Sequence, residues 1–286
     1  MKKILLPTDF SENSLNAIRY AVQLFQDEEC IFYLLNTYTP VLYDSDYILH
    51  SPTSSLSLDE VYKTNSEKGL NQVKQQVREE FPNSLHHYKL ISSFSLLNEE
   101  IKEQVASKDI DLVVMGTQGA TGAIQILFGT HTVHAIRRTT CPLLAIPSGC
   151  KYRSPANILF PTDYEINYTA EHLKLLKYLS KRHGSMIYVF HVLFGLPLGK
   201  KQEQAKSLLA NFLEDVPHQF YSAEKNTVTE GIYDFQKEHN IDLLVMISNK
   251  HSFFENQFFR PLSSKIGFQI KVPFLLIPST LPREKE

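Results

Sequence analysis

The chain is expected to fold as an α/β protein made of two tandem, doubly wound three-layer α/β/α sandwiches, each with a five-stranded parallel sheet. Short runs that are apolar throughout alternate with amphipathic helical patterns, which is typical of a parallel sheet covered by helices on both faces. The same alternation occurs twice within the 286 residues, because the sequence repeats itself.

The repeat is visible in three apolar segments that recur in the same order. The matching pairs are 4–9 with 158–163, 110–115 with 241–246, and 141–147 with 272–278. The offset falls from 154 to 131 residues, so the second copy has lost about 23 residues in its middle. A stretch containing Gly, Ser, Lys and Pro at 148–154 is typical of a linker and divides the chain into domains 1–149 and 150–286.

The first copy opens with a strand, a helix and a second strand. A fully apolar run at 3–6 indicates the first strand, and another at 31–35 indicates the second. Between them, apolar residues recur at helical spacing over 11–25, and Ser11 is in position to cap that helix. The apolar face of the helix holds Leu15, Ile18, Val22 and Phe25.

A long polar and aromatic stretch at 36–56 precedes the second helix. Long ordered connections are often lids, so this one is interpreted as a flap over a ligand, with an ordinary connecting loop as the alternative. The helix at 57–81 ends before Pro82. Its expected buried stripe is Val61, Tyr62, Leu70, Val73 and Val77.

The remainder of the first copy continues the alternation. Strands are expected at 87–91, 110–115 and 143–146, and helices at 98–108 and 132–138, the former with Ile101 and Val105 directed inward. Ligands of such sheets bind beyond the carboxyl ends of the strands, where the strand order reverses. The residues directly after the first, second and fourth strands are therefore the candidates for a site.

Composition excludes several classes of protein. Apolar residues make up 43% and charged residues 21%, which excludes disordered and low-complexity chains. The net charge of −2 gives no sign of a nucleic-acid or anionic-membrane binder. The net charge is −5 for residues 1–149 and +3 for residues 150–286. These opposite charges favour contact between the halves only weakly, because exposed charges are screened.

Cysteine usage and hydropathy point to the cytoplasm. The three cysteines are too few for a disulfide framework and are interpreted as reduced thiols. The run after Met1 is too short for a signal peptide, and no apolar run reaches the ~18 residues that span a bilayer. We therefore expect a cytoplasmic protein with neither a membrane nor a nucleic acid as partner. The pair His131 and His134 with Cys141 has no fourth ligand at a standard spacing, so no metal site of the protein's own is expected.

Glycines gather directly after the fourth strand. Four of the 11 glycines lie within 14 residues, at Gly116, Gly119, Gly122 and Gly129. A glycine-rich turn between a strand and a helix leaves N–H groups available to a phosphate, and the helix N-terminus adds partial positive charge. Neither the P-loop nor the Gly-x-Gly-x-x-Gly dinucleotide pattern is present. An unliganded connecting loop is the alternative.

The spacing Gly116-x2-Gly119-x9-Gly129-Thr130 resembles the nucleotide-binding signature of the universal stress protein family. The Pro-Thr-Asp that follows the first strand and the closing strand after Cys141-Pro142 extend the resemblance across both copies. The resemblance implies that ATP, with Mg²⁺, is held by the first domain. By position in that pattern, the nucleotide-binding residues would be Thr8, Asp9, Thr37, Met115, Gly116, Gly119, Gly129, Thr130 and Thr132.

Each position implies a part of the nucleotide. Thr8 and Asp9 follow the first strand, and Asp9 and Thr37 would lie by the adenine. Met115 and Gly116 would lie by the ribose. The phosphates would be surrounded by Gly119, Gly129, Thr130 and Thr132. A turn-forming role at the first helix is the alternative for Asp9, and the two roles are compatible.

The second copy departs from this pattern. Ile247, Lys250, Arg260 and Pro261 stand where the first copy has Gly116, Gly119, Gly129 and Thr130. Side chains fill positions where the backbone should approach a phosphate, so the second domain is interpreted as degenerate and non-binding. The alternative is that Lys250 and Arg260 bind another anion directly.

The sequence is therefore interpreted as a regulatory or stress-response protein with no catalytic residues of its own. The alternatives are a slow ATPase at the same site, because no general base or arginine finger is recognisable, and a scaffold that no longer binds nucleotide. Domains of the family often dimerise through the last strand. We therefore expect strands 143–146 and 274–277 to pair within the chain as a pseudo-dimer, with a homodimer and a protein partner of unknown kind left open.

Overall fold

The computed structural model describes residues 1–39, 58–117, 140–248 and 272–279, and these contain ten strands and six helices. The strands are β1 (Lys2–Pro7), β2 (Cys30–Tyr38), β3 (His86–Phe94), β4 (Leu112–Gly116), β5 (Leu143–Ile146), β6 (Asn157–Pro161), β7 (Met186–Leu193), β8 (His218–Glu224), β9 (Leu243–Ser248) and β10 (Phe274–Pro278). The helices are α1 (Glu12–Leu24), α2 (Leu58–Glu80), α3 (Leu97–Lys108), α5 (Ala170–His183), α6 (Lys200–Leu213) and α7 (Val228–Glu238).

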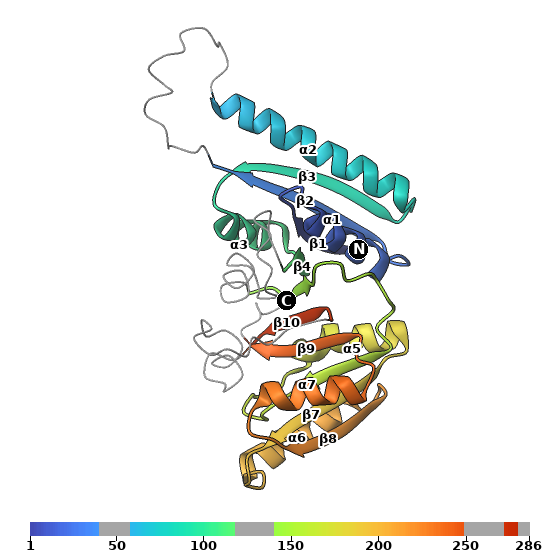
Figure 1. Cartoon of the computed structure of the whole chain (residues 1–286), viewed down its shortest axis with the longest axis vertical. Coiled ribbons are helices and arrows are strands. Elements are labelled where there is room, and N and C mark those ends of the chain that lie inside the picture. Colours follow the sequence, from blue (N-terminus) through green and yellow to red (C-terminus); the bar gives the residue numbers. More distant parts are fainter. Residues whose placement is uncertain (40–57, 118–139, 249–271, 280–286) are drawn as a thin grey trace.

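One sheet runs through the whole molecule (Figure 1). Its strand order is β3-β2-β1-β4-β5-β10-β9-β6-β7-β8, so each half supplies five neighbouring strands. The strands within each half are parallel, whereas β5 and β10 pair antiparallel, with Leu144 opposite Leu275. The two expected parallel sheets and the expected pairing of the last strands are thus confirmed, and together they form one ten-stranded sheet.

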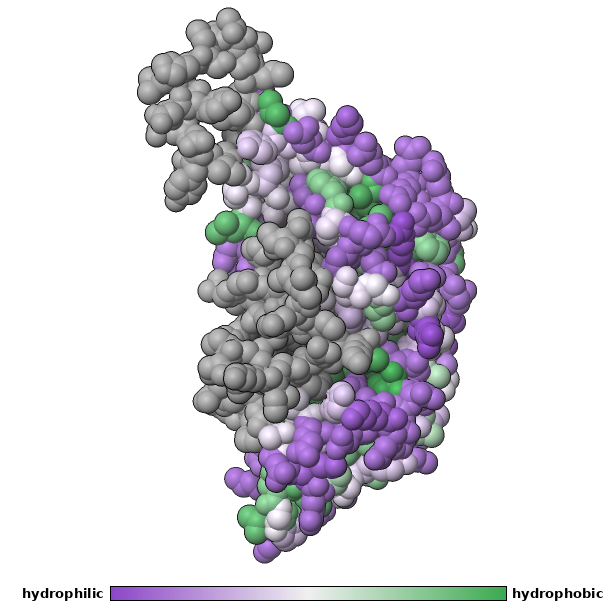
Figure 2. Space-filling model, in the orientation of Figure 1, coloured by the Kyte–Doolittle hydropathy of each residue, from purple (hydrophilic) through white to green (hydrophobic). Residues whose placement is uncertain are grey.

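The helices form the outer layers, as expected for doubly wound halves. The buried residues of α1, α2, α5 and α6 belong to a hydrophobic cluster on one face of the sheet. Those of α3 and α7 belong to a second cluster on the opposite face. Both clusters contain residues from both halves, so neither half has a separate core. The surface that Figure 2 displays is mostly hydrophilic over the described residues.

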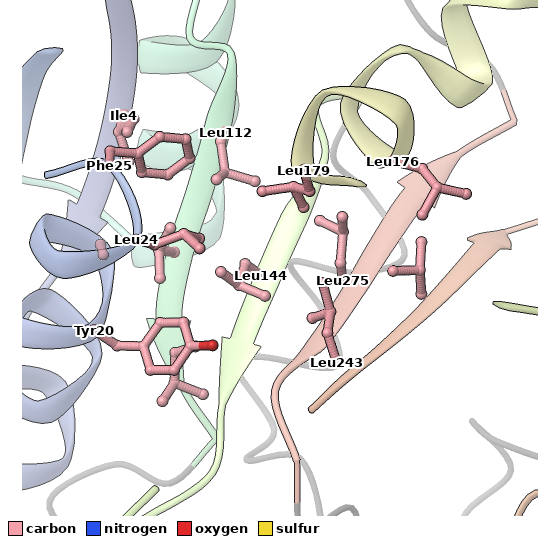
Figure 3. Packing of buried hydrophobic residues seen from close by; sticks show 14 of the residues in the cluster. Ile4, Tyr20, Leu24, Phe25, Leu112, Leu144, Leu176, Leu179, Leu243 and Leu275 are labelled. Carbon is pink, nitrogen blue, oxygen red and sulfur yellow. The ribbon is translucent and has the colours of Figure 1, made fainter. Parts of the chain in front are cut away.

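The junction between the halves is apolar at its centre and polar at its margin. Leu112, Leu144, Leu243 and Leu275 line a cavity of ≈ 10 Å³, together with side chains of α1 and α5 (Figure 3). Because such a volume holds at most about one water, the packing is close to that of a domain core. At the margin, Arg182 Nη2 lies 2.7 Å from Asp27 Oδ2. This ion pair links the second half, which has a net positive charge, to the first half, which has a net negative charge.

Two sequence-based expectations need correction, and two others lie outside the described residues. Asn36–Tyr38 continue β2, so the polar stretch after that strand begins later than predicted. Val61 is 41% exposed and therefore does not belong to the buried stripe of α2. The expected flap at 36–56 falls almost wholly outside the described residues, as does the expected helix at 132–138.

Candidate functional site

The strand order reverses between β1 and β4, and this reversal creates the candidate site. From β1 the chain crosses outward to β2 and β3, then returns to β4 on the other side of β1. Ligands of such sheets bind in a crevice outside the carboxyl ends of the strands at this reversal, which here are the ends of β1 and β4. β1 ends at Pro7 and is followed by Thr8 and Asp9, and β4 ends at Gly116 and is followed by Thr117.

A compact turn joins β1 to α1. The Thr8 hydroxyl accepts the backbone N–H of Phe10 at 3.0 Å and lies 2.9 Å from the Ser14 hydroxyl. Phe10 adopts φ 64°, a left-handed conformation that is uncommon for a residue with a side chain. Because Thr8 is buried and its hydroxyl holds this turn, its described role is structural.

Asp9 lies at the mouth of the crevice with its side chain exposed to solvent. Its Oδ1 accepts hydrogen bonds from the backbone N–H of Ser11 at 3.1 Å and from the Ser11 hydroxyl at 2.5 Å. Ser11 in turn caps α1 by accepting the N–H of Ser14 at 3.2 Å. The turn therefore fixes the position of an exposed carboxylate, which fits both roles considered for Asp9.

The end of β2 borders the same crevice. Asn36 is buried and donates its amide Nδ2 to the Thr8 carbonyl at 2.7 Å, which ties the ends of β1 and β2 together. Thr37 is partly buried and pairs in register with Ser93 of β3. Thr37 thus lies on β2, the strand next to β1. This position is compatible with Thr37 and Asp9 contacting the same ligand.

Gly116 is in close contact with α1. A Cβ atom added at Gly116 would lie 2.2 Å from Asn13 Nδ2 and 3.0 Å from the Asn13 carbonyl, so no other residue fits without a shift. The glycine at this position therefore has a packing reason that does not depend on a ligand. Met115 beside it is buried in the core cluster on the opposite face of the sheet, and its side chain is only 6% exposed.

Thr117 is the last described residue before the glycine-rich segment. Its backbone N–H donates to the Ile146 carbonyl at 3.0 Å. Its side chain is only 3% exposed, and its hydroxyl makes no hydrogen bond in the part of the chain that the structure describes. Buried hydroxyls are rarely left without a partner, so this one is a candidate for contact with a ligand.

The structure thus brings together five of the predicted site residues, namely Thr8, Asp9, Thr37, Met115 and Gly116, at the carboxyl ends of three neighbouring strands. The other four, Gly119, Gly129, Thr130 and Thr132, lie outside the described residues.

The second half repeats the scaffold of this crevice with different side chains. The Thr162 hydroxyl accepts the N–H of Tyr164 at 3.0 Å, and Tyr164 has φ 59°, which reproduces the turn around Thr8 and Phe10. His191 Nδ1 lies 2.7 Å from the Thr162 carbonyl oxygen. This contact corresponds to the hydrogen bond from Asn36 to the Thr8 carbonyl in the first half. The backbone of the site is therefore common to both halves.

The crevice of the second half is filled by its own residues. Strand pairing places Ile247 at the position of Gly116, and its side chain is buried. Tyr168 is also buried and hydrogen-bonds the Thr162 hydroxyl. A cavity of only ≈ 10 Å³ among the described residues is lined in part by Asp163, Ile166 and Ile247. This volume suits about one water.

Asp163 has a different environment from that of Asp9. Burial raises the pKa of the Asp163 carboxyl, because the charged form loses solvation. Its Oδ1 accepts the N–H of Glu165 at 3.0 Å, while its buried Oδ2 has no hydrogen-bond partner among the described residues. The same residue type at the same place in the repeat is thus exposed in one half and partly buried in the other.

Sequence reasoning missed three residues of the first crevice: Asn13, Asn36 and Thr117. Asn36 and Thr117 carry a usable signal, because each is a polar residue that directly follows a buried apolar run of a strand. Asn13 carries none, since it lies on a helix 103 residues before the glycine that it contacts.

The thiols and carboxylates give no metal centre in the described ranges. No group of three or more His, Cys, Asp and Glu side chains there is arranged to hold a metal ion, and His131 and His134 lie outside those ranges. Cys141 donates its Sγ–H to the Ile110 carbonyl, with 3.1 Å between Sγ and O. Burial raises the pKa of this thiol, so it stays protonated at neutral pH.

Comparison with known proteins gives matches in sequence and in fold. The model of the universal stress protein family matches residues 1–147. Universal stress protein MJ0531 of Methanocaldococcus jannaschii is 31% identical over 146 residues, which cover 51% of this chain and 81% of that protein. Universal stress protein MJ0577 of the same organism is 29% identical over 159 residues, which cover 51% of this chain and 94% of that protein.

Solved structures match the complete two-half arrangement. A universal stress protein from Archaeoglobus fulgidus superposes with a TM-score of 0.70 at 20% identity, covering 97% of this chain and 98% of its own. A protein of unknown function from Pseudomonas aeruginosa superposes with a TM-score of 0.59 at 12% identity, covering 98% and 93%. At these identities the structural matches show the fold alone, whereas the family model covers half of the chain. The chain therefore belongs to the universal stress protein family.

Proposed function

We propose that the chain is a regulatory protein that binds one adenine nucleotide, ATP with Mg²⁺, in the crevice of its first half. The observation that carries this proposal is the contrast between the two crevices. The same backbone scaffold presents an exposed carboxylate, Asp9, in the first half, whereas in the second half the buried Ile247 stands in place of Gly116 and only a small cavity remains among the described residues. The sequence carries the glycine-rich segment only in the first half, directly after β4.

The described residues suit the base and ribose end of a nucleotide. Asp9 is held by its turn and offers an acceptor to a donor group of the base. Thr37 lies on the adjacent strand, and the buried Thr117 hydroxyl supplies a polar group that has no partner within the described ranges. These features fit a ligand with both hydrogen-bond donors and acceptors. We assign the base to Asp9 and Thr37 and the ribose to Met115 and Gly116.

The phosphate end is assigned from the sequence pattern. Gly119, Gly129, Thr130 and Thr132 would offer backbone N–H groups and hydroxyls to the phosphates. Mg²⁺ is commonly held by substrate phosphates with few protein ligands, so it fits a crevice that lacks a cluster of acidic side chains in the described ranges. The ion would neutralise phosphate charge, and the described residues would bind and orient the nucleotide.

The test is a titration of the full chain with ATP and Mg²⁺ by isothermal calorimetry. Binding should saturate near one equivalent. Gly129→Arg places in the first half the residue type that Arg260 supplies in the second, and it should abolish binding because a side chain would occupy the space of a phosphate that needs N–H groups within about 3 Å.

The melting midpoint controls for loss of fold. At ATP one hundred times above its dissociation constant, binding adds about 2.7 kcal/mol, which corresponds to a rise of several degrees in wild type and none in Gly129→Arg. The midpoints of the two proteins without ATP should agree within a few degrees. Saturation at two equal sites, or an undiminished ATP shift in the variant, would show the assignment to be wrong.

A further inference from the structure

The connection between β7 and α6, residues 194–199, presents apolar side chains to solvent. Leu196 is 77% exposed, Phe194 is 50% exposed, and Leu198 is partly buried. Leu196 is the most exposed large hydrophobic residue of the described chain, Met1 included. Figure 1 places this connection at one end of the long molecular axis, and Figure 2 shows hydrophobic side chains at the same tip. We name residues 194–199 the apolar tip.

The apolar tip is anchored at its base. Gly195 has φ +76°, a left-handed conformation that lets the chain reverse there. At the other end, the N–H of Gly199 donates to Gln202 Oε1 at 2.9 Å, and Gln202 Nε2 donates to the Asp163 carbonyl at 3.0 Å. These bonds join the tip to the loop after β6. The exposed side chains are thus displayed by a fixed framework.

Two lysines directly follow the apolar tip in the sequence. Lys200 and Lys201 form the first turn of α6 and are both exposed. Lysines are unfavourable at a helix N-terminus, where the backbone already carries partial positive charge. The segment 194–207 contains three lysines and one acidic residue, Glu203. On the neighbouring strand, Glu224 is exposed, while Lys225 is paired with Asp234 at 2.6 Å.

The corresponding helix of the first half starts differently. α2 begins Leu58-Asp59-Glu60, with acidic residues and no lysine in these positions, as helix N-termini favour. The first turn of α6 also contains an acidic residue, Glu203, but begins with two lysines. An anionic surface that approaches the positive end of α6 would interact favourably with both lysines.

We propose that the apolar tip docks on an anionic lipid bilayer, with Leu196 entering the interfacial layer and Lys200 and Lys201 contacting lipid phosphates. An exposed apolar side chain with exposed lysines directly after it in the chain suits a membrane surface, where acyl chains lie beneath negative headgroups.

This mode of docking needs no transmembrane segment. In the described ranges, none of the helices has the length and apolar character required to traverse a bilayer. The expectation that the protein has no membrane partner was based on the lack of a transmembrane segment and on the net charge of the whole chain. Neither observation excludes a membrane contact made by the apolar tip alone. The proposal is also independent of nucleotide binding, because the tip and the first crevice belong to different halves.

The absence of tryptophan from the sequence allows a direct test on the full chain. Leu196→Trp places a single tryptophan in the apolar tip. With vesicles of phosphatidylcholine and phosphatidylserine at 3:1, its fluorescence should shift to shorter wavelength and be quenched by brominated acyl chains. The matched control is Leu96→Trp, since Leu96 is 67% exposed but lies in the first half. It should show neither change.

Sedimentation with the same vesicles measures the energetic contribution of each part. Leu196→Ser should reduce vesicle binding about tenfold, because the transfer of a leucine side chain from water to an apolar layer contributes at least that much. Leu96→Ser should leave vesicle binding unchanged. Replacing both lysines, Lys200→Gln with Lys201→Gln, should weaken binding to anionic vesicles. Raising the salt from 0.1 to 0.5 M should do the same.

Three outcomes would overturn the proposal. The first is equal behaviour of Leu196→Trp and Leu96→Trp on anionic vesicles. The second is equal binding to vesicles of phosphatidylcholine alone and to the anionic mixture. The third is a concentration-dependent dimer in solution that Leu196→Ser abolishes without any vesicle binding, which would assign the tip to self-association. Circular dichroism of each variant verifies that the fold is retained.

Discussion

At the scale of single residues, Gly116 is constrained by α1 as well as by any ligand. Its Cα faces Asn13, whose Nδ2 would lie 2.2 Å from an added Cβ. The sequence alone suggests that this glycine exists for a nucleotide. The structure shows that the end of β4 also packs closely against Asn13 in the first turn of α1, where a Cβ would force a shift.

We therefore expect Gly116→Ala to lower the free energy of unfolding by about 1–3 kcal/mol without any ligand present, as overpacking does. Urea denaturation followed by circular dichroism measures this change. Adding Asn13→Ala should restore part of the loss, because it removes the amide at 2.2 Å but leaves the backbone carbonyl at 3.0 Å. If Gly116→Ala were as stable as wild type in the absence of nucleotide, the packing explanation would be wrong.

Asp163 gives a pH-dependent prediction at the same scale. Burial raises the pKa of this carboxyl in the folded state, so the native protein holds the proton more tightly than the unfolded chain does. The stabilisation from its protonated form is fully present below the ordinary pKa of 3.8 and is lost as the pH rises through the raised value. The charged form of Asp163 therefore carries a desolvation cost in the folded protein.

Asp163→Asn should accordingly be more stable than wild type at pH 7, and the difference should shrink as the pH approaches 3.8. Asparagine keeps an oxygen to accept the N–H of Glu165. Thermal melts across this pH range measure the difference, and Glu165→Gln controls for the loss of one negative charge in the same turn. A difference that does not vary with pH would contradict the stated cause.

At the scale of elements, helix starts are set by local chemistry that the sequence reveals. Ser11, Thr169 and Thr227 each cap a helix by accepting an N–H three residues ahead. The buried residues of α1 also match the apolar spacing of its sequence. The buried residues of α2 do not match the spacing throughout, because burial of Val61 depends on the segments around the helix and not on the helix itself.

The cap of α7 can be tested away from either crevice. Thr227→Ala removes the oxygen that accepts the N–H of Glu230 at 3.1 Å, and it should lower the free energy of unfolding by about 1 kcal/mol. Thr227→Ser retains that oxygen and should cost much less. Guanidinium denaturation of the three proteins gives the comparison, and equal losses in both variants would indicate that the threonine methyl group, not the cap, is responsible.

At the scale of the whole molecule, the junction of β5 and β10 decides how the halves behave. Leu143, Leu144 and Ala145 pair with Leu276, Leu275 and Phe274, and all six are buried. The two hydrophobic clusters continue across this junction. Separating the halves would expose a strand edge together with a large apolar surface, which favours association.

Residues 1–149 expressed alone should therefore form a homodimer or an insoluble product, because a second copy can supply the missing edge. Size-exclusion chromatography with light scattering distinguishes the states. In a soluble dimer, Leu144→Asp should give monomers of lower stability, because it places a charge in the new interface. A stable monomer of unaltered 1–149 would contradict the importance of the β5–β10 pairing.

The sequence by itself determined the repeated α/β architecture, the place of most elements and the family. These depend on local spacing and on a repeat, which are linear properties of the chain. It also located Asp9, Thr37 and Gly116 near one another, because residues that follow parallel strands share one edge of the sheet. The pairing of the last strands followed from the resemblance to the family.

Only the tertiary structure decided what surrounds those residues. It showed that Asn13 fills the space beside Gly116, that the Thr8 hydroxyl stabilises a turn, and that Ile247 is buried where the first half has Gly116. It also showed that Leu196 is exposed shortly before two exposed lysines. The physical reason is that burial and contact depend on which distant segments meet, and a linear pattern carries no record of the partner that fills a given space.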